Sequence, residues 1–167
     1  MKQIVTLLLS LNGRRLNALS LIILFVSLLA YFSYIGSVSV TGFDDAYMFV
    51  RYADNFLSGY GIAWNRDGIQ TYGATSLLYL FCVTTLRRLF AEVNSASILI
   101  RASALFGILA IGVVAVTISK FSRYKSLAGS ILILAVSASY LLLSPIYRFH
   151  AVSGMDTTLS IFANSVL

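Results

Sequence analysis

Two adjacent carboxylates are the first candidates for chemistry in a chain that contains few acids. Asp44 and Asp45 are two of only six acidic residues, and they follow an apolar stretch long enough to cross a membrane. Such a pair can act as a general base, or its oxygens can hold a divalent cation such as Mg²⁺, Mn²⁺ or Ca²⁺. The alternative is helix capping, because Asp is a preferred N-cap residue. One Asp would be enough for a cap, however, and two neighbouring carboxylates repel each other.

Other polar residues occupy comparable places beside apolar runs. Asp156, in "SGMDTTL", precedes a later apolar run, where it either supports the acid pair or caps the helix expected to start near Thr157. Some arginines could bind a phosphate by forked hydrogen bonds or anchor the chain at the membrane interface, namely Arg51, Arg101 and Arg148. His150 is interpreted as a polar residue at that interface.

The composition predicts the environment in which these residues act. The chain is 59% hydrophobic and 11% charged, whereas soluble domains have about 25% charged residues. We therefore expect an all-α, polytopic integral membrane protein. The net charge of +6 does not indicate nucleic-acid binding, because the basic residues lie in small groups beside the apolar runs.

The apolar runs predict spans at about residues 16–40, 97–119 and 127–144. A fourth run at 157–167 reads as a truncated span, so we expect the sequence to be an N-terminal fragment. Basic clusters in short loops remain cytoplasmic, and two of them flank these runs: Lys2, Arg14 and Arg15, and then Lys120, Arg123 and Lys125. An even number of crossings must separate the clusters, so residues 41–96 should form one large extracytoplasmic loop. All six acids then lie outside.

Two interfacial helices are expected within this loop. Residues 45–57 show helical periodicity, with one apolar face (Phe49, Tyr52, Ala53, Phe56, Leu57) and one polar face (Tyr47, Arg51, Asp54, Ser58). Gly59 and Gly61 should end that helix, and Asp67-Gly68 should form a turn. The apolar run of 75–90 is about 12 residues, or roughly 18 Å, too short for a hydrocarbon core of ~30 Å. We interpret it as a helix that does not cross, with Arg87 and Arg88 among the headgroups, although a short span is the alternative.

Several motifs in this loop resemble a known family. "FDDAYMFVRYADNFLSGYGIAWN" resembles the first outer loop of GT-C class membrane glycosyltransferases, and most of all their AftB-like arabinofuranosyltransferase branch. Arg51-Tyr52, the glycine turn and Trp64-Asn65 match that pattern in order, and "SGMDTTL" is similar to the stretch that opens the family's fourth span. The chain departs from the pattern where Tyr72 replaces an acid, Leu77 a proline and Asp156 a glutamate.

This resemblance implies a GT-C-like transmembrane bundle and a transfer reaction outside a bacterial inner membrane. The donor would be a sugar, such as arabinofuranose, on a polyprenyl phosphate, and the acceptor a hydroxyl of a cell-envelope glycan or glycoprotein. Asp44, Asp45 and Asp156 would be the catalytic acids, with Asp44 and Asp45 as possible ligands of a cation. Substrate-binding residues would be Tyr47, Arg51, Trp64 and Asn65. An inactive remnant is one alternative, and a transporter or channel subunit, which should carry acids within its spans, is another.

Overall fold

The computed structural model describes residues 13–39, 43–67, 69, 73–121 and 126–167, and all regular structure within these ranges is helical. This confirms the predicted all-α class. The elements are α2 (Gly13–Ser37), the short 3₁₀ helix η1 (Asp44–Ala46), α3 (Tyr47–Leu57), α4 (Leu77–Leu89), α5 (Ser95–Phe121), α6 (Leu127–Leu143), α7 (Pro145–Ala151) and α8 (Thr157–Val166).

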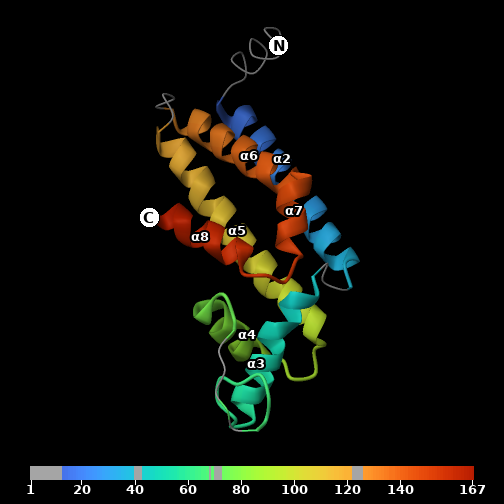
Figure 1. Cartoon of the computed structure of the whole chain (residues 1–167). Helices are drawn as coiled ribbons and strands as arrows, with labels where there is room; N and C mark the ends of the chain where they lie inside the picture. Colours follow the sequence, from blue (N-terminus) through green and yellow to red (C-terminus); the bar gives the residue numbers. More distant parts are fainter. Residues whose placement is uncertain (1–12, 40–42, 68, 70–72, 122–125) are drawn as a thin grey trace.

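Long apolar helices form a bundle on which the rest of the chain is built. In Figure 1, α2 packs along α6, and α5 packs against both α6 and α8. Helices α2 and α5, with 25 and 27 residues, are each long and apolar enough to cross a membrane. They confirm the predicted spans at 16–40 and 97–119 as helices, shifted by a few residues at their ends. The chain is therefore a membrane-embedded helical protein.

The third predicted span differs from the prediction at its end. Helix α6 covers the expected residues, but the chain does not then enter the predicted loop of 144–156. Instead α7 follows at once, bent by 70° from α6, and only the two together are long enough to be counted as a span. Ser144 and Pro145 explain this new helix start. The Ser144 hydroxyl accepts a hydrogen bond from the backbone N–H of Tyr147 at 3.5 Å, and proline suits the first helical position because it needs no N–H partner there.

Within the bundle, tyrosine side chains converge on one glycine of α5. The hydroxyl of Tyr147 donates to the Gly107 carbonyl at 2.6 Å, and a Cβ placed on Gly107 would lie 3.0 Å from the Tyr31 hydroxyl. Tyr31 itself is completely buried and donates to the Ala104 carbonyl at 3.4 Å. Gly107 thus leaves room for the Tyr31 and Tyr147 side chains against α5, as small residues do at contacts between membrane helices.

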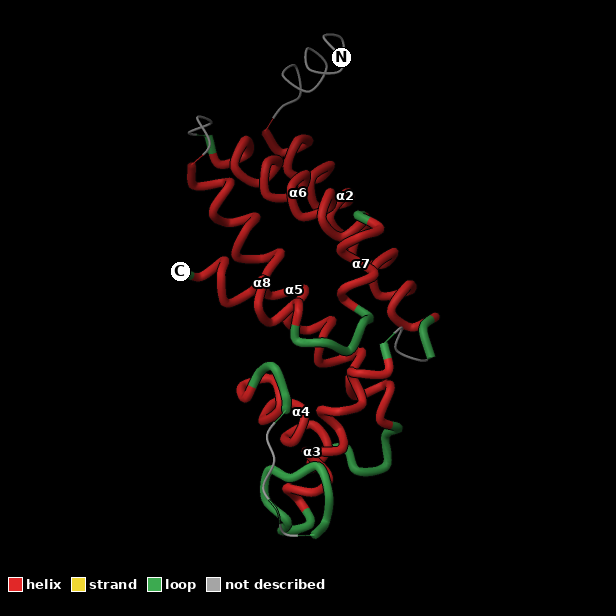
Figure 2. The backbone as a smooth tube through the Cα atoms, viewed as in Figure 1, coloured by secondary structure: helices red, strands yellow, loops and turns green. Residues whose placement is uncertain are grey.

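Helices α3 and α4 form a second, smaller layer at the Ser95 end of α5 (Figure 2). On the predicted apolar face of α3, Phe49, Tyr52 and Ala53 are buried within this layer. Phe56 and Leu57 of the same face are 41% and 39% exposed. They lie in the last turn of α3, where Phe56 reaches only the edge of the Phe81 ring, at 5.8 Å between ring centroids.

Helix α4 is short, as expected for the 75–90 run, and that it does not cross the membrane stays a prediction. It has 13 residues, about 20 Å of helix, and it is not among the candidate membrane spans. The Ser76 hydroxyl caps it by accepting from the Tyr79 N–H at 3.2 Å. Tyr79 and Val83 are fully buried between α3 and α5, whereas Leu78 is 61% exposed, so one face of α4 packs on protein and the other is free to meet lipid.

The charges divide between the two ends of the bundle. Arg14 and Arg15 begin α2 and Lys120 ends α5, and these helix ends lie together at the end opposite α3 and α4 (Figure 1). An even number of crossings between the two basic clusters fits this arrangement. Lys2, Arg123 and Lys125 lie outside the described residues. Which end faces the cytoplasm stays a prediction.

Candidate functional site

The acid pair lies in the 3₁₀ turn that leads into α3. Asp44 and Asp45 are both exposed, whereas Ala46 is buried against α3, so the turn is held by its alanine while both carboxylates face outward. An Asp44 carboxylate oxygen accepts the backbone N–H of Asp45 at 3.0 Å. Among the described residues, the Asp45 carboxylate has no hydrogen-bond partner and is available to a ligand.

Neither carboxylate makes the contact that defines a helix cap. The residues at the N-cap positions are Phe43 for η1 and Ala46 for α3, and no side chain caps either helix. The two acids do occupy the first turn, where the helix dipole favours negative charge. That electrostatic benefit is modest, and it does not require both residues to be Asp.

Arg51, Trp64 and Asn65, predicted to bind substrate, lie together. The Arg51 guanidinium donates from Nε to the Trp64 carbonyl at 2.8 Å and from Nη2 to the Asn65 Oδ1 at 3.3 Å. It also lies over the Trp64 ring, 4.2 Å from its centroid. Positive φ angles at Gly59 (86°) and Gly61 (71°) turn the chain after α3, so that Trp64 returns alongside the helix.

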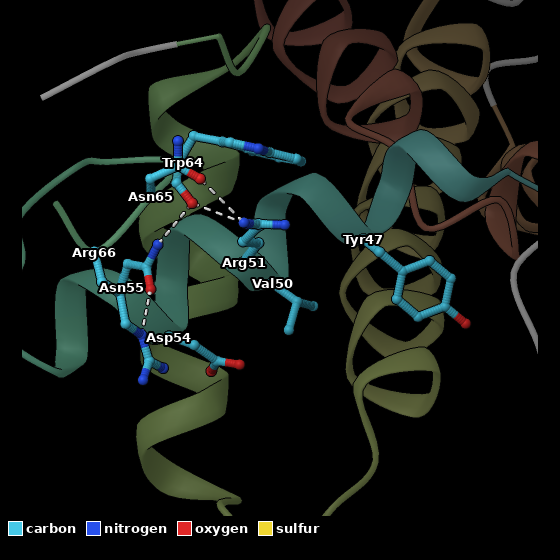
Figure 3. A pocket seen from close by; sticks show the side chains of 8 residues that line it. All are labelled: Tyr47, Val50, Arg51, Asp54, Asn55, Trp64, Asn65 and Arg66. Atoms are coloured by element: carbon cyan, nitrogen blue, oxygen red, sulfur yellow. Dashed lines mark hydrogen bonds between the residues drawn. The ribbon is translucent and has the colours of Figure 1, made fainter. Parts of the chain in front are cut away.

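Two hollows adjoin at this point. The first, the acid hollow, has a volume of about 410 Å³ and is lined by Asp44, Asp45, Tyr47, Met48, Arg51 and Trp64. The second, the arginine hollow, measures about 450 Å³ and is lined by Tyr47, Val50, Arg51, Asp54, Asn55, Trp64, Asn65 and Arg66 (Figure 3). They share Tyr47, Arg51 and Trp64, which we call the shared wall. Six of the seven predicted site residues therefore line one hollow or the other.

Asp156 is the exception. Its carboxylate accepts a hydrogen bond from the Thr75 hydroxyl at 2.8 Å, and it lines neither hollow. It is the N-cap residue of α8 by position, but its side chain makes no capping hydrogen bond. Asp156 thus links the start of α8 to the start of α4. Nearby, burial raises the pKa of the Tyr79 hydroxyl, which stays protonated and donates to the Gly154 carbonyl at 2.9 Å.

Some contacts of the site were not foreseen from the sequence. Arg87, expected among lipid headgroups, instead pairs with Asp54 through two hydrogen bonds of 2.9 and 3.3 Å, and this joins α4 to α3. Asn55 is 4% exposed, and its amide donates to the Ala63 carbonyl at 2.8 Å, which fixes the loop that carries Trp64. Arg66 donates from Nε to Asn55 Oδ1 at 3.2 Å. These partners are 8 to 33 residues apart, so no local pattern could reveal them.

The remaining sequence candidates have other positions. Arg148 lies over the Tyr34 ring at 5.2 Å, between α7 and α2. The backbone carbonyl of His150 accepts from the Ser103 and Ser153 hydroxyls. Arg101 is exposed on α5. In the predicted turn the Asp67 carboxylate accepts the Ile69 N–H at 3.0 Å, whereas Gly68 and Tyr72 lie outside the described residues.

No group of three or more His, Cys, Asp or Glu side chains gathers in a metal-binding arrangement within the described part of the chain. Asp44 and Asp45 alone offer carboxylate oxygens in the acid hollow. A cation there would need further ligands from substrate or water, as Mg²⁺ commonly does with phosphates. The divalent cation stays a prediction.

Comparison of this chain with protein-family models, with curated proteins and with solved structures finds no match.

Proposed function

We propose that this chain belongs to a membrane glycosyltransferase that moves a sugar from a polyprenyl-phosphate donor to a hydroxyl of a cell-envelope glycan or glycoprotein. One observation carries the proposal. Two exposed carboxylates and an arginine held against a tryptophan line a single hollow beside an apolar helix bundle. The sequence resemblance of residues 44–65 to GT-C enzymes gives the reaction class. The donor sugar proposed is a pentofuranose such as arabinofuranose.

The acid pair supplies the base in this scheme. The acceptor hydroxyl attacks C1 of the donor sugar while its proton passes to a carboxylate. The bond from C1 to the phosphate oxygen breaks, and its electron pair leaves with the polyprenyl phosphate. Asp45 is the better base of the two, because the Asp44 carboxylate already accepts the N–H of Asp45.

Arg51 stabilises the leaving group. Its Nε and Nη2 atoms are bound to Trp64 and Asn65, which orients the guanidinium, and Nη1 has no partner among the described residues. A fixed donor aimed at an anion that forms during reaction stabilises the transition state, because little reorganisation is then needed. A divalent cation held between the acid pair and the phosphate would also stabilise the negative charge of the leaving group.

The position of the hollow suits a donor anchored in lipid. The apolar tail would remain in the bilayer beside the bundle, while the phosphate and sugar reach the acids at its end. The proposed setting is a bacterial inner membrane with the acid hollow on the extracytoplasmic side. A transporter would instead carry acids within its spans, and α2, α5 and α6 contain none.

The test uses the longest available form of the protein, produced in its native membrane, because residues 1–167 alone are expected to show no glycosyl transfer. Asp44→Asn and Asp45→Asn are compared with Asp67→Asn, a matched control on the same loop whose side chain lines neither hollow. Transfer from radiolabelled polyprenyl-phosphate arabinose is measured, with protein levels checked for each variant. Loss of a general base should lower transfer by about 10²–10⁴-fold, and Asp67→Asn should leave it unchanged.

The capping alternative predicts another result. Asn is as good an N-cap as Asp, so both substitutions would then be harmless. If both variants keep more than about a third of the activity, the acids are not catalytic. Ion-coupled flux through reconstituted vesicles, with no sugar transfer, would support a transporter in place of the enzyme.

A further inference from the structure

The arginine hollow contains more unused hydrogen-bond donors than acceptors. Two guanidinium groups line it, from Arg51 and Arg66 (Figure 3). Each is held by Nε, Arg51 on the Trp64 carbonyl and Arg66 on Asn55 Oδ1. Because Arg51 Nη1 is assigned to the donor phosphate, the open donors here are the two Nη atoms of Arg66, which have no hydrogen-bond partner among the described residues. These donors are therefore available to a ligand.

The acceptors of the same hollow are already occupied. Asn65 Oδ1 accepts from Arg51, and Asn55 Oδ1 accepts from Arg66. Asp54 is the one carboxylate in the lining, and both of its oxygens accept from Arg87, which balances its charge. The hollow thus has a net positive charge, and its open donors match a ligand rich in acceptor atoms.

We infer that the arginine hollow binds an oxyanion, a phosphate or carboxylate group carried by the acceptor glycan. This rests on the proposed function, because it assigns the acceptor to the hollow beyond the shared wall while the donor occupies the acid hollow. Forked guanidinium groups match the paired oxygens of such anions. Trp64 and Tyr47 add aromatic surfaces on which a sugar ring can lie, and a volume of about 450 Å³ falls within the usual range of ligand pockets.

A direct binding measurement is possible because Trp64 is the only tryptophan in the chain and forms part of the shared wall. The purified protein, in nanodiscs of zwitterionic lipid, is titrated with glucose 1-phosphate, glucuronate and glucose while its fluorescence is followed. The two anions should bind at least about 10-fold more tightly than glucose, since hydrogen bonds to charged groups are the stronger class. Added salt should weaken the binding of the anions only.

Variants of one residue locate the binding. Arg66→Gln should weaken glucose 1-phosphate about 10-fold, while Arg66→Lys, which keeps the charge, should weaken it less. Arg88→Gln is the matched control, because Arg88 is exposed on α4 and lines neither hollow. Equal binding of glucose and glucose 1-phosphate would overturn the inference, as would equal effects of Arg66→Gln and Arg88→Gln.

Further measurements distinguish a failure of this inference from a failure of the proposed function. Asp45→Asn should abolish transfer yet bind glucose 1-phosphate normally. Transfer to neutral acceptors without any binding of anions would refute the inference and leave the proposed function intact. If nanodiscs containing anionic phospholipid block glucose 1-phosphate competitively, the anion recognised is a lipid headgroup, and the assignment to the acceptor is wrong.

Discussion

The helix bundle and the α3–α4 layer handle polar groups in opposite ways. In the bundle, hydroxyls bond to carbonyls of their own or neighbouring helices, as when Ser27 donates to the Ile23 carbonyl at 2.8 Å. In the α3–α4 layer, charged and amide groups connect segments that are far apart in sequence, as Arg87 does with Asp54. Most bundle hydroxyls are thus bonded internally, although Asn17 Oδ1, Ser139 Oγ and Arg148 Nε are buried without a hydrogen-bond partner among the described residues. The α3–α4 layer instead keeps several polar groups exposed to a ligand.

This contrast has a physical reason. An unsatisfied polar group in hydrocarbon costs several kcal/mol, so a membrane helix must bind its own hydroxyls. At the end of the bundle water is accessible, and donors can stay unpaired at little cost until a ligand arrives. The polar atoms free to do chemistry therefore gather in the α3–α4 layer, and substitutions should affect activity there and stability in the bundle.

The largest effect is expected for Arg51 in the α3–α4 layer. Arg51→Lys keeps the charge but cannot bond both Trp64 and Asn65 in a fixed fork, so the group proposed to bind the donor phosphate loses its orientation. Transfer should fall by about 10²-fold, comparable to the loss of one fixed transition-state donor. Radiolabelled transfer measures it, and Arg88→Lys should retain full activity. A fully active Arg51→Lys variant would show that orientation is unimportant.

In the bundle, Gly107→Ala should lower stability without any direct effect on the hollows. Its new methyl would meet the Tyr31 hydroxyl at 3.0 Å and the Tyr147 ring at 3.6 Å, and overpacking of this kind costs about 1–3 kcal/mol. Gly112 is the matched control on the same helix, because a Cβ there meets nothing within 4 Å. Thermal unfolding in detergent compares the two variants. Equal melting temperatures of the two variants would mean that the Tyr31 and Tyr147 side chains can move away from α5 without loss of stability.

The Asp54–Arg87 pair tests whether a charged contact also stabilises the α3–α4 layer. Asp54 is 38% exposed at its side chain, so solvent screens the pair and its coupling should be only about 1 kcal/mol. A double-mutant cycle of Asp54→Asn and Arg87→Gln, followed by thermal unfolding, measures that coupling. Additive effects would show that the two residues act independently.

The smallest effects on stability are expected for two serines of the bundle, Ser103 and Ser27. Ser103 contacts the His150 and Met155 carbonyls and the Thr158 hydroxyl, so Ser103→Ala breaks contacts between elements and should cost about 0.6–1.7 kcal/mol. The Ser27 hydroxyl donates only to the Ile23 carbonyl, which belongs to the same helix, α2. Ser27→Ala should therefore change stability by less than about 0.5 kcal/mol. A larger loss for Ser27→Ala would contradict this ranking.

The sequence predicted the parts of the fold that depend on local pattern. The two long apolar helices, the short helix of the 75–90 run and the glycine turn at Gly59 follow from hydropathy, length and backbone freedom, and the structure confirms them. The 70° bend was missed, although the Ser144-Pro145 pair is a local signal for a new helix start. Periodicity gave the apolar face of α3 but not how far its protein partner extends along it, since Phe56 and Leu57 stay partly exposed.

The candidate site was predicted to a similar extent. Arg51, Trp64 and Asn65 do lie together, but Asp156 binds Thr75 away from both hollows. Contacts between distant segments are set by tertiary packing, which explains why Arg87 was placed among headgroups when its partner was 33 residues away. The chemistry assigned to the site comes from the resemblance and stays a prediction.

The shared wall has a thermodynamic consequence. Tyr47, Arg51 and Trp64 face both hollows, so a ligand that shifts or orders them in one hollow changes the free energy of binding in the other. Such coupling is reciprocal, because free energy is a function of state. If a bound donor changes the affinity for the acceptor by some factor, a bound acceptor changes the affinity for the donor by the same factor. Under the proposed function, binding of donor and acceptor should therefore be thermodynamically coupled through the shared wall.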